Sequence, residues 1–181
     1  METWTLQSEY VEAAKYEVIE RLRDGRPITI RALRPDDREG LLAAVASSST
    51  QSLYRRFFSP KRSFTEREVA FFLDVDFIGH VALVAVLNEG DRPTIVGGAR
   101  YVVVQPGRAE VAFTVVDRCQ GQGIGALLMR QLAATALQAG IRELIAEVLA
   151  DNISMLKVFE KSGLRLSTKQ EAGVVHVTLQ L

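Results

Sequence analysis

Apolar residues at the start of the chain recur every four positions from Tyr10 onwards. This spacing places them on one face of a helix and predicts a helix over residues 8–23. The Asp24-Gly25 pair that follows is a stop signal. We therefore expect residues 1–25 to form a helical extension that packs on the remaining domain, residues 26–181, or on a partner subunit.

Downstream of Arg26, alternating apolar and polar residues predict strands, and stretches with helical spacing predict helices. The predicted strands are residues 28–33, 80–87, 94–104, 110–116, 143–148, 164–167 and 174–179. The predicted helices are residues 35–47, 53–58 and 65–73, one that follows a glycine-rich segment and ends by Gly140, and one that Asn152 caps and Gly163 ends. This order, β-α-α-α-β-β-β-α-β-α-β-β, predicts an α/β fold in which helices flank a mixed, mostly antiparallel central sheet.

Three glycines, Gly121, Gly123 and Gly125, alternate with Gln122 and Ile124 where a predicted strand gives way to a helix. A glycine has no Cβ, so its backbone tolerates positive φ and approaches a ligand closely. The free N–H groups of the first helical turn and the positive end of the helix dipole form an anion site. The pattern therefore predicts binding of a phosphate or diphosphate, and so of a nucleotide-containing cofactor.

The same glycines also fit the dinucleotide-binding fingerprint as Gly121-x-Gly123-x-x-Ala126, with Glu147 at a suitable distance for a ribose contact. In that fold the first glycine follows its strand almost directly, whereas here residues 117–120 intervene. That fold also usually opens with this unit, whereas a long stretch with antiparallel hairpins precedes it here. The P-loop pattern fails because no Lys-Ser/Thr pair follows the glycines. The glycines therefore favour a different cofactor.

The spacing that fits is Gln-x-x-Gly-x-Gly, at Gln120, Gly123 and Gly125, and a second motif begins at Asn152 and runs to Leu164. With these motifs, about residues 27–181 resemble the GNAT superfamily of acetyl-CoA-dependent N-acetyltransferases. The resemblance implies that acetyl-CoA is the acetyl donor.

The resemblance also implies a place for each part of the cofactor. Asn152 would meet the cofactor arm. Because the strand before the glycines is splayed from its neighbour in the family, backbone groups near Val115 and Val116 would pair with the pantetheine and the acetyl carbonyl. The amides that would hold the CoA diphosphate are those of Gln120, Gly121, Gln122, Gly123, Ile124, Gly125 and Ala126.

A narrower resemblance concerns the acceptor. Residues 30–37, 52–58 and 109–113 resemble bacterial protein-lysine acetyltransferases, which modify targets such as acyl-CoA synthetases. This resemblance implies that the acceptor is the ε-amine of a protein lysine, attacked directly in a ternary complex. Two alternatives stay open: a small-molecule amine such as an amino acid, polyamine or aminoglycoside, and a non-catalytic CoA-binding regulatory module.

Acetyl transfer to an amine needs a neutral nucleophile. A lysine with a pKa of about 10.4 costs roughly 4–5 kcal/mol to deprotonate at pH 7, whereas a thiol with a pKa near 8.5 costs only about 2 kcal/mol. A general base therefore matters more than a general acid. Glu110 is the candidate base, because it lies in a mostly apolar strand where the lysine acetyltransferases carry theirs and where burial would raise its pKa. The alternative is a strand glutamate that faces solvent.

The family's usual acid is a tyrosine seven residues after the asparagine, where this chain has Phe159. A phenyl ring cannot donate a proton, so the leaving thiolate must take one from water, from the amine or from another group. We expect Phe159 to pack against the thioester arm or the core. The acetyl carbonyl would then be polarised by the backbone N–H near Val115.

Other chemically active residues carry weaker signals. Cys119 in the glycine-rich loop suggests a ping-pong thiol, but no paired histidine is evident nearby. His80 and His176 lie in strand contexts without metal-ligand spacing, so we expect no metal. Residues 54–58 mix aromatic and basic side chains as nucleic-acid binders do, but a helix with a buried aromatic face fits an uncharged chain better.

Composition narrows the setting. Lys+Arg and Asp+Glu both number 22, so no bulk charge attracts nucleic acid or anionic lipid. A length of 181 residues predicts one main domain, and a single cysteine fits a reducing compartment. Glutamates at the N-terminus argue against a signal peptide, and no apolar run is long enough to span a membrane. We therefore expect a cytoplasmic monomer or homodimer without nucleic-acid or membrane partners.

Overall fold

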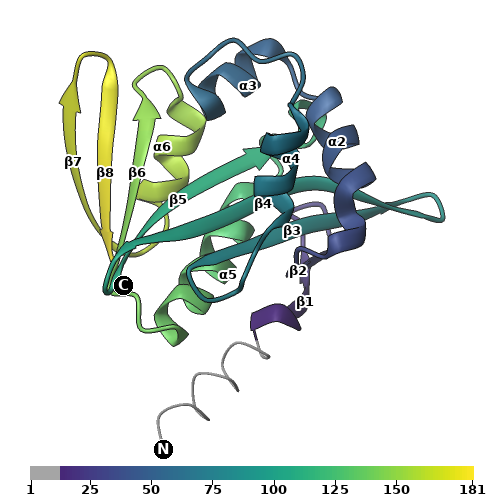
Figure 1. Ribbon diagram of the computed structural model, residues 1–181, viewed down its shortest axis with the longest axis horizontal. Helices are drawn as coiled ribbons and strands as arrows, with labels where there is room; N and C mark the ends of the chain where they lie inside the picture. The colour runs from purple at the N-terminus through teal and green to yellow at the C-terminus, as the bar shows by residue number, and fades with distance from the viewer. Residues whose placement is uncertain (1–12) are drawn as a thin grey trace, which may run out of the picture.

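One eight-stranded sheet runs through residues 13–181, the part of the chain that the computed structural model describes (Figure 1). The strand order across the sheet is β1-β2-β3-β4-β5-β6-β8-β7. Neighbouring strands are antiparallel, except that β5 and β6 are parallel. The strands are β1 (Glu17–Arg21), β2 (Pro27–Ala32), β3 (His80–Glu89), β4 (Arg92–Gln105), β5 (Arg108–Val115), β6 (Glu143–Leu149), β7 (Arg165–Glu171) and β8 (Val174–Gln180).

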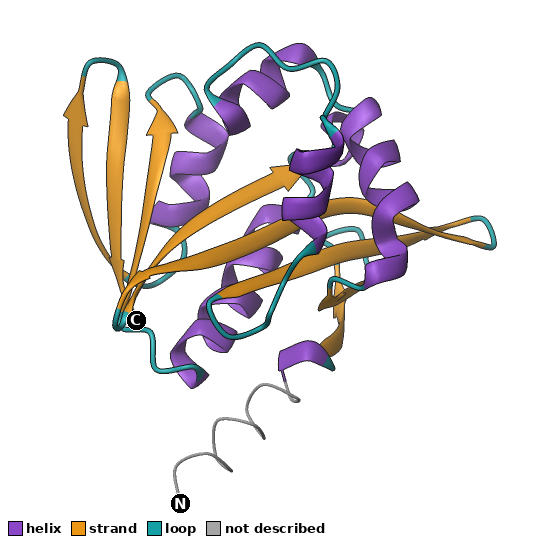
Figure 2. Ribbon diagram, in the orientation of Figure 1, coloured by secondary structure: helices purple, strands orange, loops and turns teal. Residues whose placement is uncertain are grey.

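Helices cover both faces of the sheet (Figure 2). Helices α2, α3 and α4 lie on one face, and α5 packs against the strands from the other. The predicted α/β fold with a mixed, mostly antiparallel sheet is confirmed. The helices are α2 (Arg38–Ala46), α3 (Thr50–Phe57), α4 (Glu66–Leu73), α5 (Ile124–Gln138) and α6 (Ile153–Glu160), with 3-10 turns η1 (Pro35–Asp37) before α2 and η2 (Asp117–Cys119) before α5. No helix within the described residues is both long and apolar enough to cross a bilayer.

The helix predicted over residues 8–23 is wrong for its second half, because Glu17–Arg21 form strand β1. A spacing of four is even, so it also places apolar side chains on one face of a strand, where the period is two. Val18 lies opposite Ile30, and pairing with β2 satisfies the backbone of β1 along one edge. Ile19, which a helix would have placed in the apolar stripe, is 71% exposed. The start of the predicted helix, up to residue 12, lies outside the described residues.

The main hydrophobic core lies between the sheet and α5. Gly97 of β4 allows this contact, because a Cβ there would lie 3.0 Å from the Thr114 carbonyl oxygen and 3.3 Å from side-chain atoms of both Ile124 and Leu128. Ile124 and Leu128 are themselves almost completely buried. The first turn of α5 is therefore packed directly on the sheet, which fixes the position of the glycine-rich segment before it.

Strands β5 and β6 separate soon after they pair. Their parallel register covers only Arg108–Glu110 of β5 against Glu143–Ile145 of β6. Beyond that point β5 continues beside β4, where Val115 pairs with Gly97, while β6 continues beside β8. The ribbons of β5 and β6 diverge from their common starting edge (Figure 2). The splay that the family resemblance implies is therefore present.

Candidate active site

A cavity of about 470 Å³ opens where β5 and β6 diverge, bounded also by α3, α6 and the start of α5. It brings together most of the residues predicted from the sequence, although they come from three separate segments. The predicted site residues in its lining are Glu110, Val115, Gln120, Gly121, Gly123, Ile124, Gly125, Ala126, Asn152 and Phe159.

Two predicted residues do not line this cavity. Val116 is 1% exposed and belongs to the core, and its N–H donates to the Val96 carbonyl at 2.9 Å. The backbone N–H of Val116 is therefore already used within the fold, and Val115 is the residue of this pair that lines the cavity. Gln122 is half-buried and points its side chain at neighbouring loop residues instead. The sequence could not separate these positions because they adjoin residues that do line the cavity.

The glycine-rich turn has the backbone that its sequence predicts. Gly121 and Gly123 adopt φ of +75° and +95°, a region that disfavours residues with a Cβ. Gly125 lies within the helix, where glycine is favoured for a different reason. A Cβ there would lie 3.3 Å from Cγ2 of Val158 on α6. The α5 ladder starts with the N–H of Leu127, which donates to the Gly123 carbonyl at 3.1 Å. The earlier amides of that turn precede the ladder and can bind an anion.

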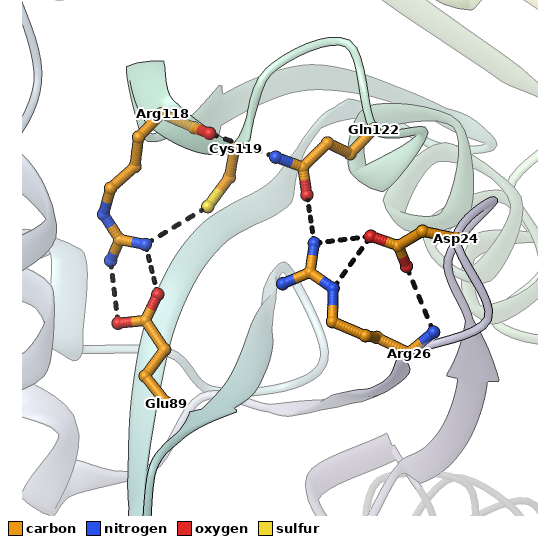
Figure 3. A network of polar contacts seen from close by, with 6 residues as sticks. All are labelled: Asp24, Arg26, Glu89, Arg118, Cys119 and Gln122. Carbon is orange, nitrogen blue, oxygen red and sulfur yellow. Dashed lines mark hydrogen bonds and ion pairs between the residues drawn. The ribbon is translucent and has the colours of Figure 1, made fainter.

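Side chains brace this turn against the rest of the molecule (Figure 3). The Gln122 amide donates to the Arg118 carbonyl at 3.0 Å and accepts from the Arg26 guanidinium at 2.8 Å. Arg26 is in turn held by Asp24 at 2.8 Å, and Arg118 makes a two-pronged ion pair with Glu89. The turn between β1 and β2 and the end of β3 therefore hold the glycine-rich turn, and Gln122 acts through its side chain.

Gln120 links the cavity wall to α3. Its side-chain amide donates to the Val115 carbonyl at 3.0 Å and to the Ser52 hydroxyl at 3.2 Å. Asp117 strengthens the same junction by accepting from the N–H of Ser49 at 2.9 Å and from the Ser52 hydroxyl at 3.2 Å. These contacts fix the end of β5 relative to α3, on which further polar side chains face the cavity.

Basic side chains that were not predicted as site residues also line the cavity, including two from residues 54–58, which were expected only to form a helix with a buried aromatic face. They come from the β1–β2 turn, from α3 and from α6, so no single stretch of sequence is strongly basic. Lys157 and Lys161 are four residues apart, the spacing that places side chains on one face of a helix, and this was the available signal. The set comprises Arg23, Arg55, Arg56, Lys157 and Lys161. These cations suit a cavity that receives a polyanionic cofactor.

Glu110 sits at the point where β5 and β6 separate, opposite Val102 of β4 and beside Ile145 of β6. Its side chain is exposed and lines the cavity, so the burial expected from its apolar neighbours is not present. Alternation along β5 buries Ala109 and Val111 and turns Glu110 to the other face. Burial lowers the pKa of Arg56 to about 10, and the charge of Glu110 acts in the opposite direction. Glu110 and Arg56 are therefore electrostatic neighbours.

The second motif contributes one capping residue and one aromatic wall. Asn152 caps α6, because its side-chain oxygen accepts from the Met155 N–H at 3.3 Å. Phe159 is 1% exposed and packs edge-on against Phe113, with ring centroids 5.8 Å apart. Phe159 therefore does pack into the core, as expected, and also forms part of the cavity wall.

The remaining cysteine and histidine side chains lie in surroundings that indicate structural roles. Cys119 is 3% exposed, and burial raises the pKa of its thiol. His80 is 8% exposed; its Nδ1 donates to the Asp74 carbonyl and its Nε2 accepts from Arg100. His176 is exposed beside Glu147, at 3.4 Å. Within residues 13–181, no three side chains of His, Cys, Asp or Glu gather as metal ligands.

Comparison with known proteins agrees with this geometry. The model of the acetyltransferase (GNAT) family matches residues 47–164. Acetyltransferase Pat of Mycolicibacterium smegmatis is 35% identical over 159 residues, which are 86% of this chain and 46% of the relative. Acetyltransferase PA5475 of Pseudomonas aeruginosa is 32% identical over 138 residues, which are 76% of this chain and 74% of that protein. This chain thus spans less than half the length of the Mycolicibacterium relative.

A solved structure shows the same family likeness. The crystal structure of the GNAT domain of S. lividans PAT superposes with a TM-score of 0.84 and 34% identity, and the match covers 91% of this chain and 97% of that domain. The splay of β5 and β6, the positive φ of Gly121 and Gly123 and the matched family model are all consistent with one family. This chain belongs to the GNAT acetyltransferase family.

Proposed function

We propose that this chain transfers the acetyl group of acetyl-CoA to the ε-amine of a protein lysine, with Glu110 as the general base. The observation that carries the proposal is one continuous cavity that joins the anion-binding turn of α5 to the carboxylate of Glu110. A donor held at one end of this cavity can therefore meet an acceptor amine at the other.

The residues present fit acetyl-CoA. Among the described residues, no side chain caps the N-terminus of α5, so the amides of Gly121 to Ala126 are suited to the CoA diphosphate. Lys157 and Lys161 add positive charge to the lining of the same cavity. Val115, Phe113 and Phe159 provide an apolar wall for the pantetheine arm. When bound, acetyl-CoA supplies the activated thioester.

The chain's own groups then act on the acceptor. Glu110 accepts a proton from the lysine ammonium, so that a neutral amine attacks the thioester carbonyl directly; the N–C bond forms and the C–S bond breaks. The N–H of Val115 is the group we assign to polarise that carbonyl. Phe159 has no proton to give, so the thiolate receives its proton from solvent or from the attacking amine.

Protein lysine is favoured as acceptor by the resemblance of residues 30–37, 52–58 and 109–113 to protein-lysine acetyltransferases. An acyl-CoA synthetase is the kind of protein target that this resemblance suggests. The related proteins above are named as acetyltransferases, in agreement with an enzymatic role.

The test is transfer of acetyl from acetyl-CoA to three classes of acceptor: an acyl-CoA synthetase, lysine-containing peptides, and a panel of free amines that includes amino acids, polyamines and aminoglycosides. Thiol release and mass spectrometry report the reaction and the modified atom. We expect acetylation at lysine ε-nitrogen in protein or peptide. Turnover with free amines alone would favour the small-molecule alternative, and binding of acetyl-CoA without any turnover would favour a regulatory module.

A further inference from the structure

A second, smaller cavity lies on the α2–α4 side of the sheet, and two arginines line it. Its volume is about 80 Å³, several times the ~10–15 Å³ that one water molecule requires. Its walls are mostly apolar, but they include Arg56 of α3 and Arg100 of β4. Arg56, Ala112 and Thr114 line both this cavity and the larger one. We call the smaller cavity the arginine pocket.

Strand register places the arginine pocket next to the candidate base. Arg100 lies directly opposite Ala112, and Glu110 is two residues before Ala112 on β5. Side chains two residues apart on a strand share a face, so Arg100 and Glu110 are diagonal neighbours on one face of the sheet. Helix α3 contacts β5 on this side and brings Arg56 to the same place.

Neither arginine forms an ion pair with a carboxylate of the described residues at hydrogen-bonding range. The Arg100 guanidinium donates to the Phe72 carbonyl at 3.3 and 3.4 Å and to Nε2 of His80 at 2.9 Å. It also lies over the Phe72 ring, 4.9 Å from the centroid. Arg56 lies over the Phe57 ring at 4.7 Å. Every one of these partners is neutral, so they orient the two cations without neutralising them.

The two cations are also close enough to repel each other. Burial, with a smaller contribution from Arg56, lowers the pKa of Arg100 to about 10. Both guanidinium groups remain charged at neutral pH, because a pKa of about 10 is still well above 7. Two partly desolvated like charges are stabilised when an anion enters between them. Glu110 offers Arg56 part of this stabilisation, but it gives up its own charge when it accepts a proton.

We propose that the arginine pocket binds a carboxylate carried by the acetyl acceptor. The inference rests on the proposed function and narrows its substrate class: the favoured lysine has an acidic side chain near it in the target. A lysine ammonium alone would approach two positive charges at Glu110, whereas a carboxylate on the same acceptor offsets them. The free α-carboxylate of a small amino acid carries the same chemistry, so the test must separate these two sources.

The experiment measures kcat/KM for a neutral peptide with one central lysine flanked by Gln and Ala, and for versions in which one Gln at a time becomes Glu. Nα-acetyl-lysine and its methylamide form a second pair that differs only in the α-carboxylate. We expect at least one Glu peptide to exceed its Gln partner by about tenfold, the size of one charge-assisted contact. A preference confined to Nα-acetyl-lysine would instead identify the α-carboxylate as the source.

Variants connect the preference to the pocket. In Arg56→Gln the ratio of Glu to Gln peptides should fall to about one, and Arg56→Lys should retain part of it. Arg38→Gln on neighbouring α2 is the matched control, because Arg38 is a partly exposed arginine paired with Glu66 and lies outside both cavities. It should keep the full preference. Arg100→Lys is a second probe, should Arg56→Gln fail to fold.

Binding of a peptide in which norleucine replaces the lysine tests the arginine pocket separately from the proposed lysine acetylation. Tighter binding of its Glu form to the wild type, lost in Arg56→Gln, would support the pocket even if no lysine were acetylated and the proposed function had failed. Lysine peptides acetylated at rates that ignore flanking charge, or an unchanged ratio in Arg56→Gln, would overturn the arginine pocket and leave the proposed function standing.

Discussion

The ring of Phe159 meets the ring of Phe113 edge-on, at 5.8 Å between centroids and 78° between planes. Phe159 is almost completely buried and stands where the family resemblance places a tyrosine acid. A phenyl ring has no proton to donate, so this position cannot supply an acid. Phe159 instead packs in the core and forms an apolar part of the cavity wall.

We expect Phe159→Ala to lower the free energy of unfolding by about 3–5 kcal/mol, because it removes a buried ring and leaves a cavity. Phe159→Leu keeps more of the volume and should lose clearly less. Urea denaturation followed by circular dichroism measures both. A loss of under about 1 kcal/mol for Phe159→Ala would show that the ring is not packed as described.

Replacing Gly123 by alanine should weaken CoA binding. Gly123 has φ of +95°, and a left-handed conformation costs a residue with a Cβ roughly 1–2 kcal/mol. We expect Kd for CoA, measured by calorimetry, to rise about tenfold. Gly90→Ala is the matched control, because Gly90 also has positive φ but lies outside the cavity. Gly90→Ala should lose stability without any change in Kd, and an equal rise in both variants would contradict the assignment.

Lys157 of α6 and Lys161, the residue that follows α6, should bind CoA through charge. We expect Lys157→Gln and Lys161→Gln each to raise Kd for CoA about two- to fivefold at low salt, the range of a partly exposed charge contact. The difference should shrink at high ionic strength, since salt screens exposed charges. Lys169→Gln on β7, an exposed lysine outside the cavity, should leave Kd unchanged. Salt-independent losses would point to a packing role instead.

The ion pair between Arg31 and Asp37 should contribute to the pH dependence of the free energy of unfolding at acidic pH. Both terminal nitrogens of the Arg31 guanidinium, Nη1 and Nη2, donate to the carboxylate at 2.7 Å, and the backbone N–H of Arg34 donates to it at 2.7 Å. Burial alone would raise the pKa of Asp37, but these contacts outweigh it, and the pKa lies below its usual range.

Because the folded pKa of Asp37 is depressed, its contribution is complete above the unfolded pKa of about 3.9 and is lost as pH falls through the folded value. We expect Asp37→Asn to lose about 3 kcal/mol at pH 7, because Arg31 is left without its partner. The difference between wild type and variant should narrow below about pH 4 in denaturation experiments. A constant difference from pH 7 to pH 3 would contradict this.

Local patterns predicted most of the fold from residue 27 onwards. Helix and strand periods differ clearly in that region, and caps such as Thr65 and Asn152 mark helix starts. Residues 17–21 were predicted incorrectly because a four-residue spacing fits both the helix and the strand period. Pairing with strand β2 makes this segment a strand. Such long-range pairing cannot be detected in a short window of sequence.

The candidate site was predictable where backbone chemistry fixes the residue type, as at Gly121 and Gly123. It was not predictable where the role depends on a distant partner. Gln122 braces the turn through Arg26, 96 positions away, and Arg56 reaches the cavity from α3. Val116 turns inward beside Val115, which lines the cavity, because one residue along a strand reverses the side chain.

The central claim, that Glu110 is the base at the acceptor end of a CoA cavity, is tested most directly by Glu110→Gln. The measurements are kcat for peptide acetylation and Kd for acetyl-CoA, with Glu160→Gln, an exposed α6 glutamate outside the cavity, as the control. We expect kcat to fall by about 10²–10⁴ while Kd stays within error, since a base acts on the acceptor proton and not on the donor. An unchanged kcat in Glu110→Gln would contradict the account.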